Sequence, residues 1–247
     1  FTSILEWCKK KSYRFITLQE CYAILSGKIR QEGKVAYLSF DDGWQSNLNL
    51  IPIIDKYQAP ITIFVSIDPL LSGNFWWEYA LADGIELRNK MKLMSYKKFV
   101  SSLESLKKKY SLERSVLTEQ ELVKIASHPL VSIQSHTMSH PILTNCDDEI
   151  LSYELNSSKA YLENLLHHKI EAFSYPNGSF SNREIEAVKK AGYKMAFTTE
   201  YIPIQINHTN LYRIPRMAMN TYGAVSYTHL RAHEALMNLV CRLLLEK

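Results

Sequence analysis

The chain has 247 residues, of which 46% are hydrophobic and 22% charged, and this balance excludes a disordered, collagen-like or coiled-coil protein. No apolar run approaches the ~18 residues of a membrane-spanning helix, and a net charge of +4 is too small to indicate nucleic-acid binding. The four cysteines lie far apart without a C-x-x-C pair, so neither a disulfide framework nor a thiolate metal site is expected.

Short apolar runs alternate with helical segments along most of the chain. The apolar runs are typical of strands buried on both faces of a parallel sheet; they cover residues 35–40, 60–66, 130–134, 172–175, 195–199 and 211–217. Helical spacing and capping boxes predict helices at 48–57, 118–127, 149–168 and 181–192. The alternation predicts an α/β fold with a parallel sheet, open or closed into a barrel, and functional groups at the carboxyl ends of its strands.

Residues 68–117 interrupt this alternation and are expected to form a helical insertion over the mouth or side of the sheet. The segment is rich in lysine, which is typical of a solvated helix face. It also contains Phe75, Trp76 and Trp77 in succession. These aromatic side chains could stack on a sugar ring or pack in a core, and the sequence leaves both open.

The two ends of the chain suggest a fragment. It begins at Phe1 without a charged-then-apolar signal region, so localisation cannot be argued. Residues 225–247 resemble the translated read-through of a sequencing adapter, and we therefore expect one domain at 1–224 followed by a non-native tail. The His229 and His233 pair in that tail is discounted as a metal site, and the apolar run 236–245 is compatible with a helix.

Polar side chains follow the first predicted strand in the sequence S-F-D-D-G-W. Asp41 and Asp42 are adjacent carboxylates, and the glycine-assisted turn after them can bring both into one site with different roles. The alternative is an ordinary Asp-Asp-Gly turn in which one carboxylate caps the next helix.

Two histidines follow the strand at 130–134 in the sequence S-H-T-M-S-H-P. His136 and His140 have the i, i+4 spacing that places two imidazoles on one side of a helical turn, and imidazole is a common zinc ligand. The alternative is that one histidine caps a helix while the other is solvated.

A tight turn follows the strand at 172–175. The turn Pro176-Asn177-Gly178 could direct backbone N–H groups into the mouth of the sheet, although an ordinary loop is the alternative. Together the three segments that follow these strands provide one carboxylate and two imidazoles for a metal. They also provide a second carboxylate to accept a proton from water, and N–H groups for an oxyanion. This equipment indicates metal-assisted hydrolysis of an acyl bond.

The motifs S-F-D-D-G, H-T-M-S-H and F-S-Y-P-N-G, in this order, resemble the first three motifs of the polysaccharide deacetylases, carbohydrate esterase family 4. The resemblance implies a distorted (β/α) barrel of about seven parallel strands and a divalent metal, most commonly zinc. It also implies hydrolysis of N-acetyl, or less often O-acetyl, groups on a glycan substrate, in the bacterial cell envelope or outside the cell. By position, Asp41 matches the catalytic base, and Asp42, His136 and His140 match the metal ligands.

The sequence departs from the family pattern in two places. Many members carry an arginine in the third motif and an aromatic residue after its proline, where this chain has Ser174 and Asn177. Arg213 or Arg216 is expected to supply the missing guanidinium to Asp41. The late Leu-x-Leu-x-His motif, which provides the usual general acid, is not visible.

Several aromatic and loop residues are expected to contact the substrate; these are Trp44, Trp76, Trp77, Tyr175 and Pro176. Two other functions remain open. One is a glycan-binding protein that keeps the metal without turnover, and the other is a metal-independent glycosidase that uses Asp41 with a distant carboxylate.

Overall fold

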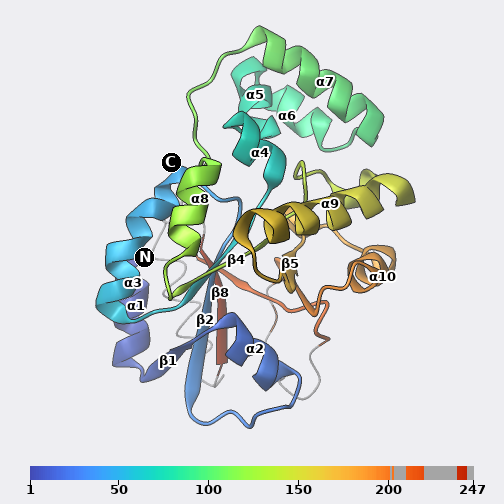
Figure 1. Ribbon diagram of the computed structural model, residues 1–247. Helices are drawn as coiled ribbons and strands as arrows, with labels where there is room; N and C mark the ends of the chain where they lie inside the picture. The colour runs from blue at the N-terminus through green and yellow to red at the C-terminus, as the bar shows by residue number, and fades with distance from the viewer. Residues whose placement is uncertain (201, 203–209, 220–237, 244–247) are drawn as a thin grey trace.

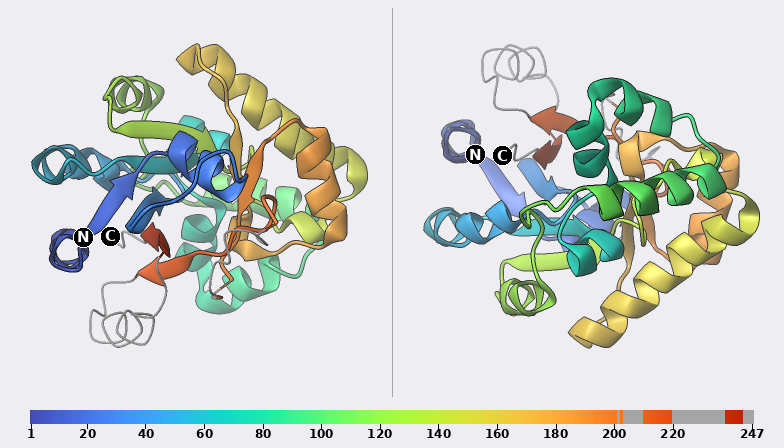
Figure 2. Two further views of the ribbon diagram at one scale, coloured as in Figure 1. Left: turned by 90° about the horizontal axis from the view of Figure 1, so that it is seen from below. Right: turned by 90° about the horizontal axis from the view of Figure 1, so that it is seen from above.

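A curled parallel sheet forms the centre of the molecule in the computed structural model, which describes residues 1–200, 202, 210–219 and 238–243 (Figure 1). Its eight strands pair in the order β6-β5-β4-β3-β2-β8-β7, with β1 beside β2, and all pairings are parallel. The strands are β1 Tyr13–Ile16, β2 Lys34–Phe40, β3 Ile61–Val65, β4 Val131–Ser135, β5 Ala172–Ser174, β6 Met195–Phe197, β7 Met217–Met219 and β8 Asn238–Leu243. Figure 2 shows the sheet end-on, with helices around its outer side.

Helices follow most of the strands, as the sequence pattern predicts. They are α1 Thr2–Lys10, α2 Leu18–Leu25, α3 Ile51–Tyr57, α4 Ile67–Ser72, α5 Trp76–Asp83, α6 Ile85–Met91, α7 Tyr96–Lys109, α8 Glu119–Ala126, α9 Asp148–Leu166 and α10 Asn182–Lys190, with short 3₁₀ segments η1 Gln45–Leu50, η2 Leu143–Asn145 and η3 Pro176–Gly178. The predicted capping boxes at the starts of α8 and α10 are present.

The predicted α/β architecture with a parallel, barrel-like sheet is confirmed, but two details of the prediction are wrong. The number of about seven strands is not confirmed, since the described residues form a sheet of eight. The strand predicted at 211–217 is reduced to a bridge between Ile214 and Phe197, and β7 begins only at Met217. Residues 238–243 form a strand beside β2 instead of a helix, because periodicity alone does not distinguish a short apolar helix from a strand.

The rest of the predicted tail, 225–237 and 244–247 with His229 and His233, lies outside the described residues. Its assignment as non-native therefore stays a prediction. Among the described residues, no helix is both long and apolar enough to cross a bilayer.

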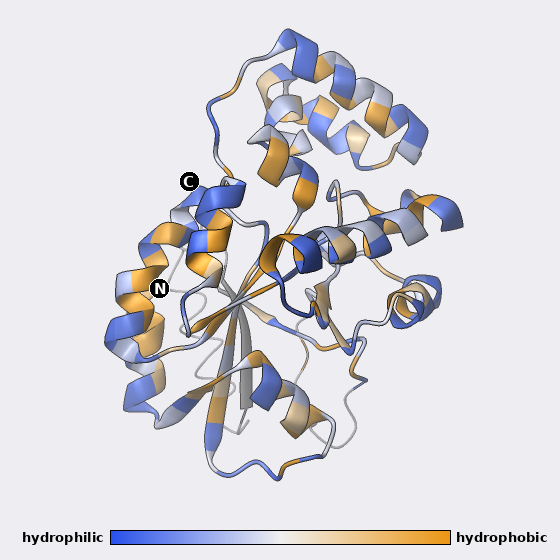
Figure 3. Cartoon of the chain, in the orientation of Figure 1, coloured by the Kyte–Doolittle hydropathy of each residue, from blue (hydrophilic) through white to orange (hydrophobic). Residues whose placement is uncertain are grey.

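Strand β2 is almost continuously apolar because both of its faces are buried. Ala36, Leu38 and Phe40 belong to one buried cluster, whereas Val35 and Tyr37 belong to a second cluster. Alternate side chains of a strand point to opposite faces, so a sheet covered on both faces needs apolar residues at every position. Figure 3 shows the hydrophobic strands inside and the hydrophilic faces of the surrounding helices outside.

The predicted helical insertion consists of α4 to α7 and lies above the carboxyl ends of the strands in Figure 1. It has a small core of its own, formed by Trp76, Tyr79, Ala80, Met91, Phe99 and Leu106. The insertion therefore covers the end of the sheet at which the candidate catalytic residues lie.

Candidate metal centre

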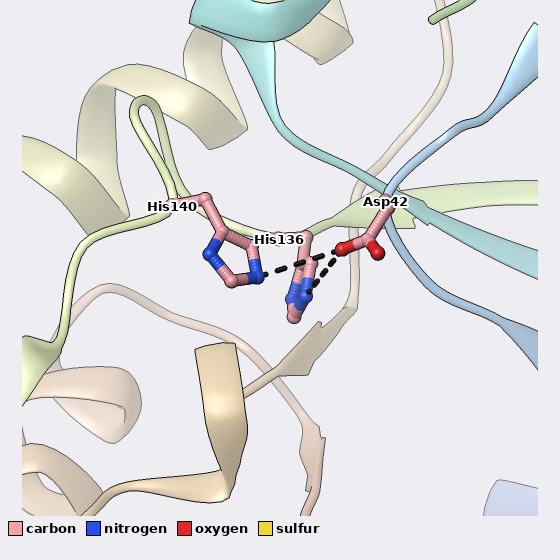
Figure 4. Close-up of side chains that lie close together, drawn as sticks. All are labelled: Asp42, His136 and His140. Carbon is pink, nitrogen blue, oxygen red and sulfur yellow. Dashed lines mark ion pairs between the residues drawn. The ribbon is translucent and has the colours of Figure 1, made fainter. Parts of the chain in front are cut away.

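Asp42, His136 and His140 converge at the carboxyl ends of β2 and β4 (Figure 4). The Asp42 Oδ1 atom lies 3.5 Å from Nε2 of His136 and 3.5 Å from Nε2 of His140. All three residues are buried. Two ligand atoms that are each about 2.0–2.1 Å from a tetrahedral zinc ion lie roughly 3.4 Å apart, so the observed spacing suits a shared dication.

Two of these ligand atoms have unsatisfied hydrogen-bonding capacity. Within the described part of the chain, Asp42 Oδ1 and His136 Nε2 are buried and have no hydrogen-bond partner. The other nitrogen of the His136 ring, Nδ1, lies 2.7 Å from the carbonyl oxygen of Ser174. That contact places the proton on Nδ1 and leaves the Nε2 lone pair directed at the site, as in a metal-ligating histidine. The three side chains therefore fit a divalent metal ion.

The Asp42 carboxylate is held in its charged form. Burial raises its pKa, but the adjacent imidazoles of His136 and His140 outweigh burial and lower the pKa below its ordinary value. The indole Nε1 of Trp44 donates to Asp42 Oδ2 at 3.1 Å. Trp44 therefore fixes one carboxylate oxygen and leaves the other directed at the imidazoles.

The backbone of the site adopts conformations that side-chain-bearing residues usually avoid. Asp42, Thr137 and His140 have positive φ angles of 79°, 74° and 54°. Left-handed conformations are unfavourable for residues other than glycine, and they cluster at functional sites where the surrounding structure enforces them. No feature of the sequence indicated this strain.

Asp41 lies beside the candidate metal ligands, with Oδ2 3.9 Å from Nε2 of His136. The guanidinium of Arg216 donates to both carboxylate oxygens, at 2.8 and 2.9 Å, and the Ser174 hydroxyl donates to Oδ2 at 3.2 Å. Arg213, the other candidate for this contact, is exposed and pairs with Glu200. Of the two arginines, Arg216 is thus the one that holds Asp41.

The turn Pro176–Gly178, which follows β5, is only partly available to a substrate. Asn177 is exposed and has a φ of 54°. The Gly178 N–H, which we expected to face an oxyanion, instead donates to the Tyr175 carbonyl at 3.0 Å. Pro176 is buried, and Tyr175 is buried with its hydroxyl donating to the carbonyl of Tyr212. The expectation that Tyr175 and Pro176 contact substrate finds no support in this packing.

An aromatic wall, which we define as Trp44, Phe75 and Trp77, borders the metal ligands. Trp77 stacks on Phe75 at a centroid distance of 4.1 Å and meets the His140 ring at 4.7 Å. Trp44 contacts Phe75 at 4.9 Å. Trp44 and Trp77 are only partly buried, whereas Trp76 is buried and donates from Nε1 to the His140 carbonyl at 3.0 Å. Trp76 therefore packs in the insertion and braces the site, which contradicts a stacking role for it.

A family model described as polysaccharide deacetylase matches residues 28–196, well over half of the chain. The chain belongs to the polysaccharide deacetylase family. It is 26% identical over 222 residues to poly-β-1,6-N-acetyl-D-glucosamine N-deacetylase of Staphylococcus aureus, covering 89% of this chain and 66% of that protein. It is 25% identical over 201 residues to the Bacillus subtilis protein YxkH, which is named for the same family, covering 81% of this chain and 57% of that protein. The chain thus spans less than two thirds of the length of these curated relatives.

Two solved structures share the fold. IcaB from Ammonifex degensii superposes with a TM-score of 0.65 at 17% identity, over 92% of this chain and 86% of that chain. The Streptococcus pyogenes deacetylase PplD, solved with acetate, superposes with a TM-score of 0.58 at 21% identity, over 98% and 78%. At these identities the similarity establishes the barrel-like fold that the resemblance implied.

One residue beside the metal ligands was missed by sequence reasoning. Glu154 of α9 is fully buried and contacts the segment between His136 and His140. The available signal was a carboxylate on the apolar face of a helix, between Leu151 and Leu155. Such a position is unfavourable for a charge unless hydrogen-bond donors meet it.

Proposed function

We propose that this chain is a zinc-dependent hydrolase that removes N-acetyl groups from a glycan. The observation that carries the proposal is the convergence of Asp42, His136 and His140, with Asp41 immediately beside them. A zinc ion held by these three side chains would polarise an acyl carbonyl and lower the pKa of water toward about 7.

Asp41 is proposed as the general base. Its carboxylate is oriented by Arg216 and Ser174, so that it stays adjacent to the metal ligands and can accept a proton from the attacking water. The exposed Asn177 turn is proposed to offer its backbone N–H to the developing oxyanion, because the Gly178 N–H is already engaged.

Trp44 and Trp77 are proposed to contact a sugar ring. They are the partly buried members of the aromatic wall beside His140, and aromatic faces suit the apolar face of a pyranose. The name of the Staphylococcus aureus relative supports an N-acetylglucosamine polymer as the substrate class.

The test is acetate release from β-1,6-linked N-acetylglucosamine oligomers with zinc present. We expect acetate to appear, to stop when a chelator removes the metal and to resume when zinc is restored. Binding of metal and oligomer without acetate release would instead identify a glycan-binding protein. Chelator-insensitive formation of new reducing ends would identify a glycosidase.

A further inference from the structure

The loop Thr137–His140, which joins the two candidate histidine ligands, is held by hydrogen bonds from its backbone N–H groups. Its first and last residues, Thr137 and His140, have left-handed φ angles of 74° and 54°. The N–H groups of Met138 and Ser139 donate to Oε2 of Glu154 at 2.8 and 2.9 Å. The His140 N–H donates to the Thr137 hydroxyl at 3.0 Å. The carboxylate therefore fixes the part of the loop that precedes His140.

The other oxygen of Glu154, Oε1, accepts hydrogen bonds from two hydroxyl groups. Ser139 donates to Oε1 at 2.6 Å, and Tyr96 of α7 donates to it at 3.2 Å. Burial raises the pKa of Glu154 above its ordinary value, although its hydrogen bonds with Ser139 and Met138 partly oppose that rise. Its carboxylate is bonded by four donors, two on each oxygen, and so joins the loop to α7.

The insertion braces the same loop through two side chains. Tyr96 reaches the loop through Glu154, and Trp76 donates from Nε1 to the His140 carbonyl at 3.0 Å. The loop is thus held directly by hydrogen bonds from α5 and α9 and indirectly from α7 through Glu154, although it has no regular secondary structure of its own.

We propose that Glu154 is a positioning residue of the metal centre, and that Tyr96 links its carboxylate to the helical insertion. Glu154 holds Met138 and Ser139 so that the strained His140 backbone keeps Nε2 facing Asp42. The inference rests on the metal site of the proposed function. Replacing a residue that orients a metal ligand without contacting the metal usually changes the metal affinity.

The test compares metal affinity among variants, using Co²⁺ absorption and competition with a chromogenic chelator. Glu154→Met removes both acceptors at similar side-chain length, and we expect about 10- to 100-fold weaker Co²⁺ binding and an altered spectrum. Glu154→Gln should restore most of the affinity, because its amide oxygen can accept the two N–H groups while both hydroxyls can accept from its NH₂ group. Tyr96→Phe should weaken binding by about 2- to 10-fold through loss of one hydrogen bond.

Two controls on the same helix separate positioning from stability. Leu162→Ala removes a fully buried side chain remote from the loop, so it should destabilise the protein without changing Co²⁺ affinity. Glu149→Met alters an exposed position of α9 and should change neither property.

Equal affinity of Glu154→Met and the unmodified protein would overturn the inference, as would an equal loss of affinity in Leu162→Ala. Absence of Co²⁺ binding by the unmodified protein would instead overturn the proposed metal site. Should Glu154→Met fail to fold, Tyr96→Phe decides, since unchanged affinity there contradicts the link to the insertion.

Discussion

Arg216 and Asp41, which are 175 residues apart in the sequence, form a two-point ion pair beside the metal ligands. Both side chains are fully buried. The remaining guanidinium donors bond to Ser39, Ser174 and the Thr198 carbonyl. A buried charge is tolerated when it is paired and its other donors are satisfied, and both conditions hold here. The segment just before β7 thereby fixes the orientation of the proposed base.

Replacing Arg216 should be far more damaging than replacing Arg213. Arg216→Met leaves the Asp41 carboxylate buried without its cation, and we expect a loss of about 3–5 kcal/mol in the free energy of unfolding. Arg213→Met breaks a half-exposed ion pair with Glu200 and should cost about 0–1 kcal/mol. Urea unfolding of both variants measures the difference. Similar losses in the two variants would contradict the assignment of Arg216 as the partner of Asp41.

Asp41→Asn should separate metal binding from turnover. Asp42, His136 and His140 are unchanged in this variant, so zinc affinity should stay close to that of the unmodified protein. Loss of the proposed base should reduce the rate of acetate release by about 10²- to 10⁴-fold. Metal titration and an acetate assay on the same preparation provide the measurement. Retained turnover combined with lost metal would show that Asp41, instead of its neighbour, is the ligand.

Zinc should raise the thermal stability of the folded protein. A ligand that binds only the folded state at 100 times its Kd adds about 2.7 kcal/mol to the free energy of unfolding, so the melting temperature should rise with zinc concentration. Asp42→Ala removes a carboxylate oxygen that lies 3.5 Å from both imidazoles and should abolish most of this rise. Thermal scans with and without zinc test the effect. A full response from Asp42→Ala would place the metal elsewhere.

Gly178 should tolerate substitution less well than a glycine with the same backbone conformation in open space. A Cβ at Gly178 would lie 1.8 Å from Oγ1 of Thr199, whereas one at Gly27 would have no atom within 4 Å. Both glycines have a φ near 70°, so Gly27→Ala should cost roughly 1–2 kcal/mol for the left-handed backbone alone. Gly178→Ala should lose roughly a further 1–3 kcal/mol from the steric clash.

Chemical denaturation of both glycine variants measures these costs. Adding Thr199→Ala to the Gly178→Ala chain should recover part of the loss, because it removes the nearest atom. Equal destabilisation at Gly27 and Gly178 would mean that Thr199 moves aside freely.

The sequence alone determined the main strands and the candidate metal ligands. Strands β2 to β6 and the start of α8 follow from apolar runs and capping residues, which are local properties of the chain. The motifs containing Asp42, His136 and His140 directly follow β2 and β4. Because parallel strands present their carboxyl ends at one edge of the sheet, strand prediction was sufficient to bring these side chains together.

Only the tertiary structure decided which neighbouring residues serve the site. Arg213 and Arg216 are three residues apart, yet one pairs with Glu200 and the other with Asp41, according to how the chain enters β7. Likewise, Trp76 packs inward while Trp77 meets His140, because adjacent positions of α5 face different directions. Glu154 acquires its role from donors on the His136–His140 loop and on α7. These pairings join segments remote in sequence, and no local pattern encodes the direction from which a distant side chain arrives.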